Sequence, residues 1–139
     1  MKVEFVSIFS LYDMPIEGIV LPPSGEGLSY ACTVAFDVKQ RRHVLAIAPI
    51  QSDTGQLLIS LVEAPWVQLR EAVQTLIANL RGTVTLAEID RLTENVLRTT
   101  SVDIELVRED LGLEIDEATQ AERIERMRAL LDRERESGS

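Results

Sequence analysis

The chain of 139 residues carries a formal net charge of −9, and 45% of its residues are hydrophobic, 27% are charged and 4% are aromatic. This length and composition are typical of one globular domain, which buries a largely aliphatic core without a metal or a disulfide. The excess of acidic residues argues against nucleic acid as a partner, because lysine and arginine must neutralise nucleic acid phosphates.

The first nine residues combine one lysine with an apolar stretch that contains Glu4. A signal peptide would have a longer apolar run and no acid at this point, so we interpret the segment as a strand. No apolar run approaches the ~20 residues of a membrane span, and we expect no membrane association and a cytoplasmic protein. The single cysteine, Cys32, excludes an intramolecular disulfide. Twelve arginines against two lysines suggest a GC-rich genome, that of a bacterium or its phage.

Residues 28–36 alternate large and small side chains, which predicts a β-strand. A basic turn at 38–42 leads into a second apolar strand at 43–48, and the turn residues Ser52-Asp53-Thr54-Gly55 precede a third at 57–62. The turn predicts Phe36 opposite His43, Val34 opposite Leu45 and Cys32 opposite Ile47. One face of the resulting meander would then hold Tyr30, Val34, Phe36, Leu45, Ile47, Ile59 and Leu61.

The second half of the chain has helical patterns. Pro65 and a stripe of apolar residues predict a helix that ends near Gly82. The capping-box pattern Thr85-Leu86-Ala87-Glu88 predicts a helix to about Thr100. A short helix is expected at 102–111, and a last one begins near Asp116 and runs towards Glu134.

We therefore predict a single α+β domain over residues 1–139. It has an antiparallel meander of three to four strands in residues 1–64, followed by three to four helices in residues 65–136. Both faces of the sheet are apolar, whereas an antiparallel sheet with one solvated face alternates apolar and polar residues. We expect helices on one face, and further helices or a second chain on the other.

Two patterns have part of the outline of a phosphate site or a catalytic site, but each lacks a required feature. Gly25 and Gly27 precede a strand and flank Glu26, whereas a phosphate-binding loop leads into a helix N-terminus. Cys32 and His43 are the chain's only cysteine and histidine, but the expected register separates them by ~13 Å along the strand. We expect no catalytic constellation.

Two further patterns partly match a metal-binding loop and a DNA-binding motif. Asp110, Glu114 and Asp116 lack the spacing of a calcium loop, so we expect no metal and no other cofactor. Residues 86–111 have the outline of a helix-turn-helix motif. Its second helix carries four acids against one arginine, which opposes DNA binding.

The last helix has a narrow apolar stripe within dense charge, so it requires a surface to pack on. That surface is either its own domain or a second chain. The leading hypothesis is a non-catalytic protein–protein interaction or assembly subunit, oligomeric or part of a larger complex. Its candidate interface combines the small-residue sheet face with this stripe: Ala46, Ala48, Ile50, Leu58, Ala121, Ile124, Met127 and Leu131.

Two alternatives stay open. The net charge fits an acidic inhibitor or antitoxin-like protein that covers a basic site of a partner. The other alternative is a small-molecule-binding domain, with polar groups at one end of the sheet: Tyr30, Asp37, Arg42 and His43. Asp37 and Arg42 are also placed to form a cross-strand ion pair.

Overall fold

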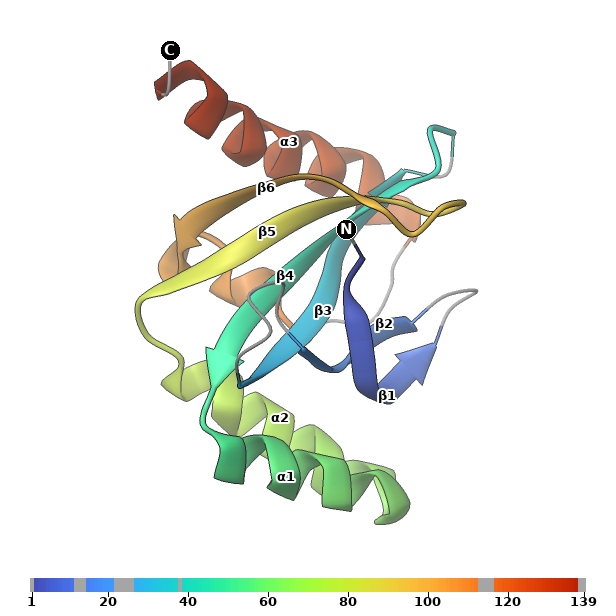
Figure 1. Cartoon of the computed structure of the whole chain (residues 1–139), viewed down its shortest axis with the longest axis vertical. Coiled ribbons are helices and arrows are strands. Elements are labelled where there is room, and N and C mark those ends of the chain that lie inside the picture. The colour runs from blue at the N-terminus through green and yellow to red at the C-terminus, as the bar shows by residue number, and fades with distance from the viewer. Residues whose placement is uncertain (1, 12–14, 22–26, 38, 113–116, 138–139) are drawn as a thin grey trace.

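The computed structural model describes residues 2–11, 15–21, 27–37, 39–112 and 117–137. Figure 1 shows its main elements in chain order: β1 (Glu4–Leu11), β2 (Pro15–Leu21), β3 (Leu28–Asp37), β4 (Arg42–Ile50), α1 (Ser52–Ser60), α2 (Trp66–Asn79), β5 (Thr83–Asp90), β6 (Val96–Asp103) and α3 (Gln120–Ser137). Short 3-10 turns lie between them: η1 (Leu61–Glu63), η2 (Ile104–Leu106), η3 (Arg108–Asp110) and η4 (Glu117–Thr119).

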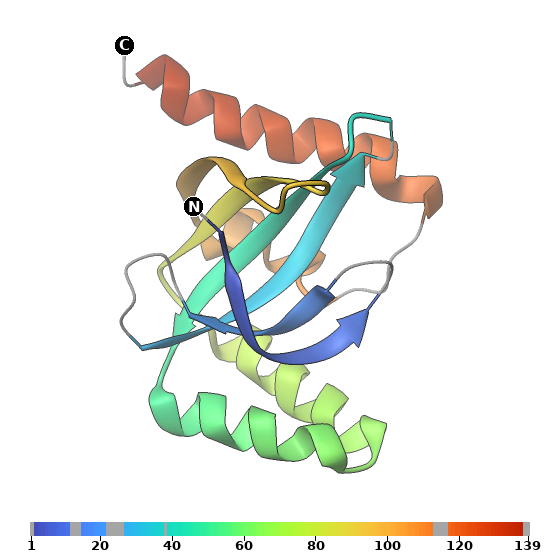
Figure 2. The same cartoon turned by 45° about the vertical axis from the view of Figure 1, so that its right-hand side comes forward.

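The six strands form one antiparallel sheet in the order β1-β2-β3-β4-β5-β6. The α+β class is confirmed. The prediction of a three- to four-stranded meander followed by three to four helices is wrong, because the sheet has six strands and α1 and α2 lie between the fourth and the fifth. In Figure 2, α1 and α2 lie near the lower end of the sheet and α3 near its upper end.

The strand expected at residues 57–62 is helical, within α1 and η1. Its continuous apolar run has no period-2 alternation and fits a helix as well as a strand. The Gly55 N–H donates to the Gln51 carbonyl at 3.0 Å, so residues 53–55 form the first turn of α1 instead of a hairpin.

The helix expected at residues 85–100 is the β5–β6 hairpin. Half of the residues in each strand are β-branched and favour extended backbone, and this preference outweighs the capping-box pattern at 85–88. Leu86 lies in the core beneath the helices and Ala87 in a core on the opposite face, which is strand alternation. Residues 102–111, expected as a helix, are the end of β6 and two 3-10 turns.

The predicted β3–β4 hairpin is confirmed, with Phe36 opposite His43. A β-bulge near the middle of β3 shifts the register by one residue, so Cys32 lies opposite Ala46 instead of Ile47. A slip of one residue moves side chains to the other face of a sheet. The expected single face is therefore divided: Tyr30, Val34, Ile59 and Leu61 belong to the helix-covered core, and Leu45 and Ile47 to the opposite core.

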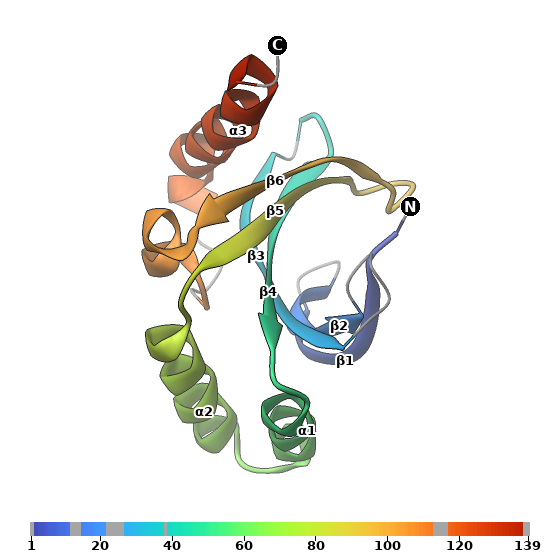
Figure 3. The same ribbon diagram turned by 60° about the vertical axis from the view of Figure 1, so that its left-hand side comes forward.

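The sheet is strongly curled, and Figure 3 shows α2 and α3 on its convex side. On the concave side β1 curls back towards the β5–β6 hairpin, where Lys2 and Asn95 form an isolated antiparallel bridge. Val3 and Phe5 pack there against a second core, formed by Val20, Ala31, Leu45, Ile47, Ala87 and Ile89. The sheet thus covers much of its own second apolar face, which we expected helices or another chain to cover.

The main core lies between the convex face and the helices. It includes Leu69, Val73 and Ile77 of α2 and Ile124, Met127, Leu130 and Leu131 of α3. These four residues of the apolar stripe of α3 are therefore buried against their own chain. No described helix is long and apolar enough to cross a lipid bilayer.

Candidate functional site

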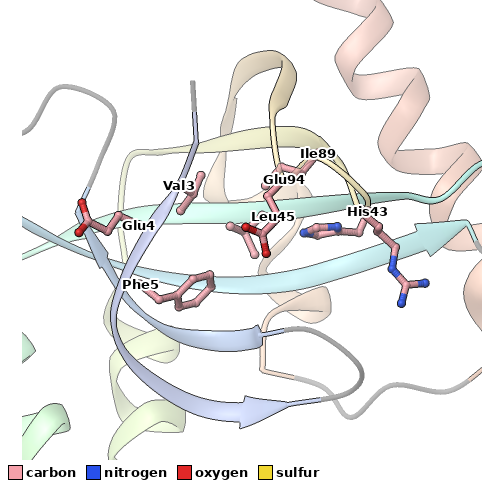
Figure 4. Close-up of a pocket in the computed structure, with 8 residues that line it drawn as sticks. Val3, Glu4, Phe5, His43, Leu45, Ile89 and Glu94 are labelled. Atoms are coloured by element: carbon pink, nitrogen blue, oxygen red, sulfur yellow. The ribbon is translucent and has the colours of Figure 1, made fainter.

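The concave side of the sheet holds a cavity of about 290 Å³, near the end where β1 meets the β5–β6 hairpin. Figure 4 shows the residues around it, which come from β1, β4, β5 and the β5–β6 loop. Its lining is half apolar and half polar: Val3, Phe5, Leu45 and Ile89, and Glu4, His43, Arg91 and Glu94.

Strand alternation explains the apolar wall of the cavity. Val3 and Phe5 are two residues apart, and so are His43 and Leu45, so each pair points to one face of its strand. His43 lies opposite Ile89 in the β4–β5 ladder, which places both side chains on the concave face. The wall therefore consists of side chains of the second core that the curl of the sheet leaves only partly covered.

His43 is the most enclosed polar residue of the cavity lining. Only 7% of its surface is exposed, and its Nδ1 has no hydrogen-bond partner among the described residues. Burial, together with the positive charge of Arg91, lowers the pKa of His43 to about 4. The imidazole is therefore neutral at pH 7. A buried polar atom without a partner typically costs about 1–3 kcal/mol, unless a ligand or water satisfies it.

The β5–β6 loop supplies two of the charged lining residues, Arg91 and Glu94. The Leu92 N–H donates to the Asp90 carboxylate at 2.8 Å and the Glu94 N–H to the Asp90 carbonyl at 2.8 Å. Glu94 adopts a left-handed backbone conformation with φ of 63°, which is uncommon for a residue with a Cβ. Strained backbone of this kind is often found at functional sites.

A second hairpin tip supports this loop. The Arg91 N–H donates to the carbonyl of Arg41, whose φ is 55°, and Arg42 forms an ion pair of 3.1 Å with Asp90. The main-chain N–H groups of Leu92 and Thr93, with Arg42, lower the pKa of Asp90, so this carboxylate is ionised at neutral pH. The β3–β4 turn thereby holds the loop in place at the cavity.

The convex side offers a second polar cluster, but it is engaged within the chain. Glu17 of β2 is buried, binds Arg70 of α2 through both oxygens and accepts a hydrogen bond from Tyr30. Arg70 stacks on Trp66 with 4.6 Å between the guanidinium carbon and the ring centroid. Burial raises the pKa of Tyr30 well above its usual value. These contacts join α2 to the sheet, and we assign the cluster a structural role.

Charged residues also attach α3 to the sheet. Arg128 of α3 contacts Asp37 at 3.2 Å and Glu88 at 3.4 Å, and Asp132 of α3 pairs with Arg98 of β6. Arg126 of the same helix pairs with the buried carboxylate of Asp110. These ion pairs fix the orientation of α3 on the convex face.

The four polar residues considered for ligand binding do not form one site. Tyr30 bonds to Glu17 on the convex side, whereas His43 lines the cavity on the concave side. Asp37 lies opposite Arg42 in the ladder as expected. The ion pairs of these two residues run instead to Arg128 and Asp90, respectively. Of the four, only His43 lines the cavity.

Cys32 and His43 lie on opposite faces of the sheet, in the main core and at the concave cavity. Burial raises the pKa of the Cys32 thiol to about 12, so the thiol is protonated and unreactive at neutral pH. The described residues contain no cluster of metal-ligating side chains. Glu114 and Asp116 of the acidic cluster and residues 22–26 of the glycine-rich segment lie outside the described residues.

The candidate interface residues are mostly internal. Ala46, Ala48, Leu58, Ile124, Met127 and Leu131 lie in the main core, Ile50 packs against it, and Ala121 is exposed. A protein partner would have to use other residues unless the core opened.

Sequence reasoning missed the other lining residues. Glu94 and Arg91 fell within an expected helix, although Asp90-Arg91-Leu92-Thr93 between two β-branched segments is also a turn signal. The contributions of Val3 and Phe5 depend on the curl of the sheet, which no local pattern indicates. Comparison of the chain with protein-family models, curated proteins and solved structures finds no match.

Proposed function

We propose that the protein is a non-catalytic small-molecule-binding domain whose ligand occupies the concave cavity. The observation that carries this proposal is the cavity itself, in which an apolar wall meets the neutral imidazole of His43 and the charged groups of the β5–β6 loop. A pocket with apolar walls and a few polar groups is the usual form of a ligand site.

The size of the cavity supports the same function. Its volume is about 290 Å³, and an apolar cavity of about 150 Å³ is enough to hold benzene. One ring with a short polar side chain fits this space. The ring would contact apolar residues such as Phe5 and Leu45, and the polar end would lie near His43 and the β5–β6 loop.

A titration with one-ring compounds that carry neutral, acidic or basic end groups tests this proposal, with amide resonances as the readout. We expect saturable shifts centred on Phe5, His43, Leu45 and Ile89. Ile89→Phe adds bulk at the cavity wall and should weaken binding by at least about tenfold, which corresponds to ~1.4 kcal/mol.

Leu76→Phe is the matched control, because it adds bulk in a groove between α1 and α2. It should leave the affinity unchanged. Equal effects of the two variants, or shifts scattered over the surface, would contradict binding in the cavity.

The α1–α2 groove supports a second candidate function, the binding of a protein partner. The groove has a volume of about 490 Å³, and Leu57, Ala72 and Leu76 contribute its apolar part. Leu57 is 56% exposed. Glu71 lines the same groove, so an amphipathic helix with basic flanking residues fits its shape and charge.

This second function corresponds to the hypothesis of a protein–protein interaction subunit. Because the chain is acidic, we expect its partner to be basic. A basic partner would associate with the protein more slowly as salt increases, because charge steering is screened. Leu57→Ser should weaken capture of such a peptide, with Leu106→Ser, another exposed leucine, as the control. Equal capture by both variants would exclude the groove.

A further inference from the structure

We infer that the cavity selects an apolar amine, whose ring lies against Phe5 and Leu45 and whose ammonium group lies between Glu94 and His43. This inference rests on the proposed function and specifies the chemistry of the ligand. It follows from the two polar side chains that enter the cavity, the charges around it and the shape of its apolar wall.

The polar groups that reach into the cavity include two hydrogen-bond acceptors. Figure 4 shows the Glu94 carboxylate and the His43 imidazole, from the loop and from β4, pointing into the same space. An ionised carboxylate only accepts hydrogen bonds, and a neutral imidazole always has one nitrogen with a free lone pair. An ammonium group donates three hydrogen bonds and can satisfy both residues.

The protonation state of His43 allows it to accept a hydrogen bond from an ammonium group. Its pKa of about 4 keeps the ring neutral at physiological pH, so the free lone pair persists there. Arg91 contributes to this state through its charge. An imidazolium would instead repel a cationic ligand and would favour a carboxylate.

Glu94 is the acidic group that a ligand beside His43 would meet, because Glu4 projects away from the space between these two residues (Figure 4). Arg91 is the basic group of the lining, and His43 is neutral. The formal charge of the whole chain is −9, which draws cations to its surface. A ligand carboxylate would be drawn to Arg91 but would be placed beside Glu94.

The apolar wall determines the chemistry of the part of the ligand that lies away from the ammonium group. Val3, Phe5, Leu45 and Ile89 offer hydrocarbon and one aromatic ring, and an aromatic ring also attracts a nearby ammonium group. The probe that fits these features is 2-phenylethylamine. Its matched analogues are 3-phenylpropanoate, with a carboxylate, and ethylbenzene, with no polar group.

The experiment uses the full chain without a histidine tag, because His43 is then the only histidine and gives a single set of imidazole resonances. Each probe is titrated while these resonances and the amide resonances are recorded. We expect 2-phenylethylamine to shift His43 saturably and to bind at least about tenfold more tightly than either analogue, because hydrogen bonds between charged groups are stronger than those between neutral groups.

Glu94→Gln keeps the shape of the side chain and removes its charge. Glu94 is exposed, so the fold should survive, and the affinity for the amine should fall by about tenfold. Glu63→Gln is the control, because Glu63 is also exposed but lies in η1. It should change the affinity less than twofold.

The outcomes separate this inference from the proposed function. If the carboxylate or ethylbenzene binds in the cavity as tightly as the amine, the inference is overturned and the cavity remains a binding site. Equal affinity of the amine for the wild type and Glu94→Gln also overturns it. If no probe binds, the inference fails, and the proposed function falls if the wider set of one-ring compounds also leaves the cavity resonances unchanged.

Discussion

The buried polar groups on the two faces of the curled sheet differ in their hydrogen bonding. On the convex face, Glu17, Tyr30 and Arg70 bond to one another, and Arg70 leaves only its Nε without a partner. On the concave face, the buried atoms His43 Nδ1 and Thr33 Oγ1 have no partner among the described residues. The polar groups of the convex face hold α2 on the sheet, whereas the concave face combines two unpartnered buried atoms with an open cavity lined by His43.

The same difference appears in what covers each face. Three helices and several ion pairs cover the convex core. The concave core is smaller, and β1 closes over it only in part, which leaves the cavity beside Phe5 and Ile89. This contrast predicts that mutations on the two faces differ in their cost to stability and in their effect on binding.

The largest expected effect is on the convex face. Arg70→Met leaves the buried Glu17 carboxylate without its charged partner, and removing one member of a buried ion pair costs about 3–5 kcal/mol. Urea unfolding followed by circular dichroism measures the change. Arg81→Met is the control, because Arg81 is exposed and bonds only to nearby carbonyls. A loss for Arg70→Met no greater than for the control would contradict the structural role of the pair.

The next effect concerns His43 and pH. Its folded pKa of about 4 lies below the usual value of 6.5, so the unfolded chain binds a proton between these values while the folded chain does not. Stability should therefore fall as pH falls from about 6.5 to 4, by up to about 3 kcal/mol, and this contribution should level off at lower pH.

His43→Phe removes this titration while it keeps a ring of similar size. The difference in unfolding free energy between wild type and variant should decline across this pH range. The carboxylates titrate in both proteins and largely cancel in the difference. A difference independent of pH would show that His43 is not buried in the neutral form.

A smaller effect separates the two cores. Leu86 is enclosed in the convex core, whereas one side of Leu45 faces the cavity. Large-to-small substitutions in a core cost about 2–5 kcal/mol. Leu45 has fewer packing contacts to lose, because atoms at the edge of a void lack neighbours on that side. We expect Leu86→Ala to cost about 1 kcal/mol more than Leu45→Ala, measured by urea unfolding. A reversed order would mean that the concave core is the better packed of the two.

The smallest expected effect on stability is that of a substitution in the β5–β6 loop. Glu94→Gln should change the free energy of unfolding by less than about 0.5 kcal/mol, because the residue is exposed and its side chain serves no packing role. Thermal unfolding without ligand measures this. A larger loss would give Glu94 a structural role and would weaken its use as a binding residue.

Local patterns in the sequence predicted part of this molecule. The β3–β4 turn placed Phe36 opposite His43 correctly, because a short hairpin fixes the pairing near its tip. The bulge in β3 then moved Cys32 to a different partner, and no residue type marked its position. The β5–β6 hairpin was mistaken for a helix because its apolar residues also fit a helical stripe.

The site was less accessible to sequence reasoning. His43 was among the candidate ligand-binding residues, but Tyr30, Asp37 and Arg42 were placed with it because they share one hairpin. The structure replaces them with Phe5, Glu94 and Arg91, which reach His43 only because the sheet curls and β1 meets the β5–β6 loop. The curl arises from the packing and the bulges of the whole sheet, so it cannot be predicted from the sequence of any single strand.

The central claim is that the concave cavity is the binding site and the convex face its scaffold. A crystal structure of the protein grown with 2-phenylethylamine tests it most directly. We expect the ring of the amine against Phe5 and Leu45 and its nitrogen within hydrogen-bond distance of Glu94 and His43. An amine bound in the α1–α2 groove with the concave cavity empty would contradict the claim.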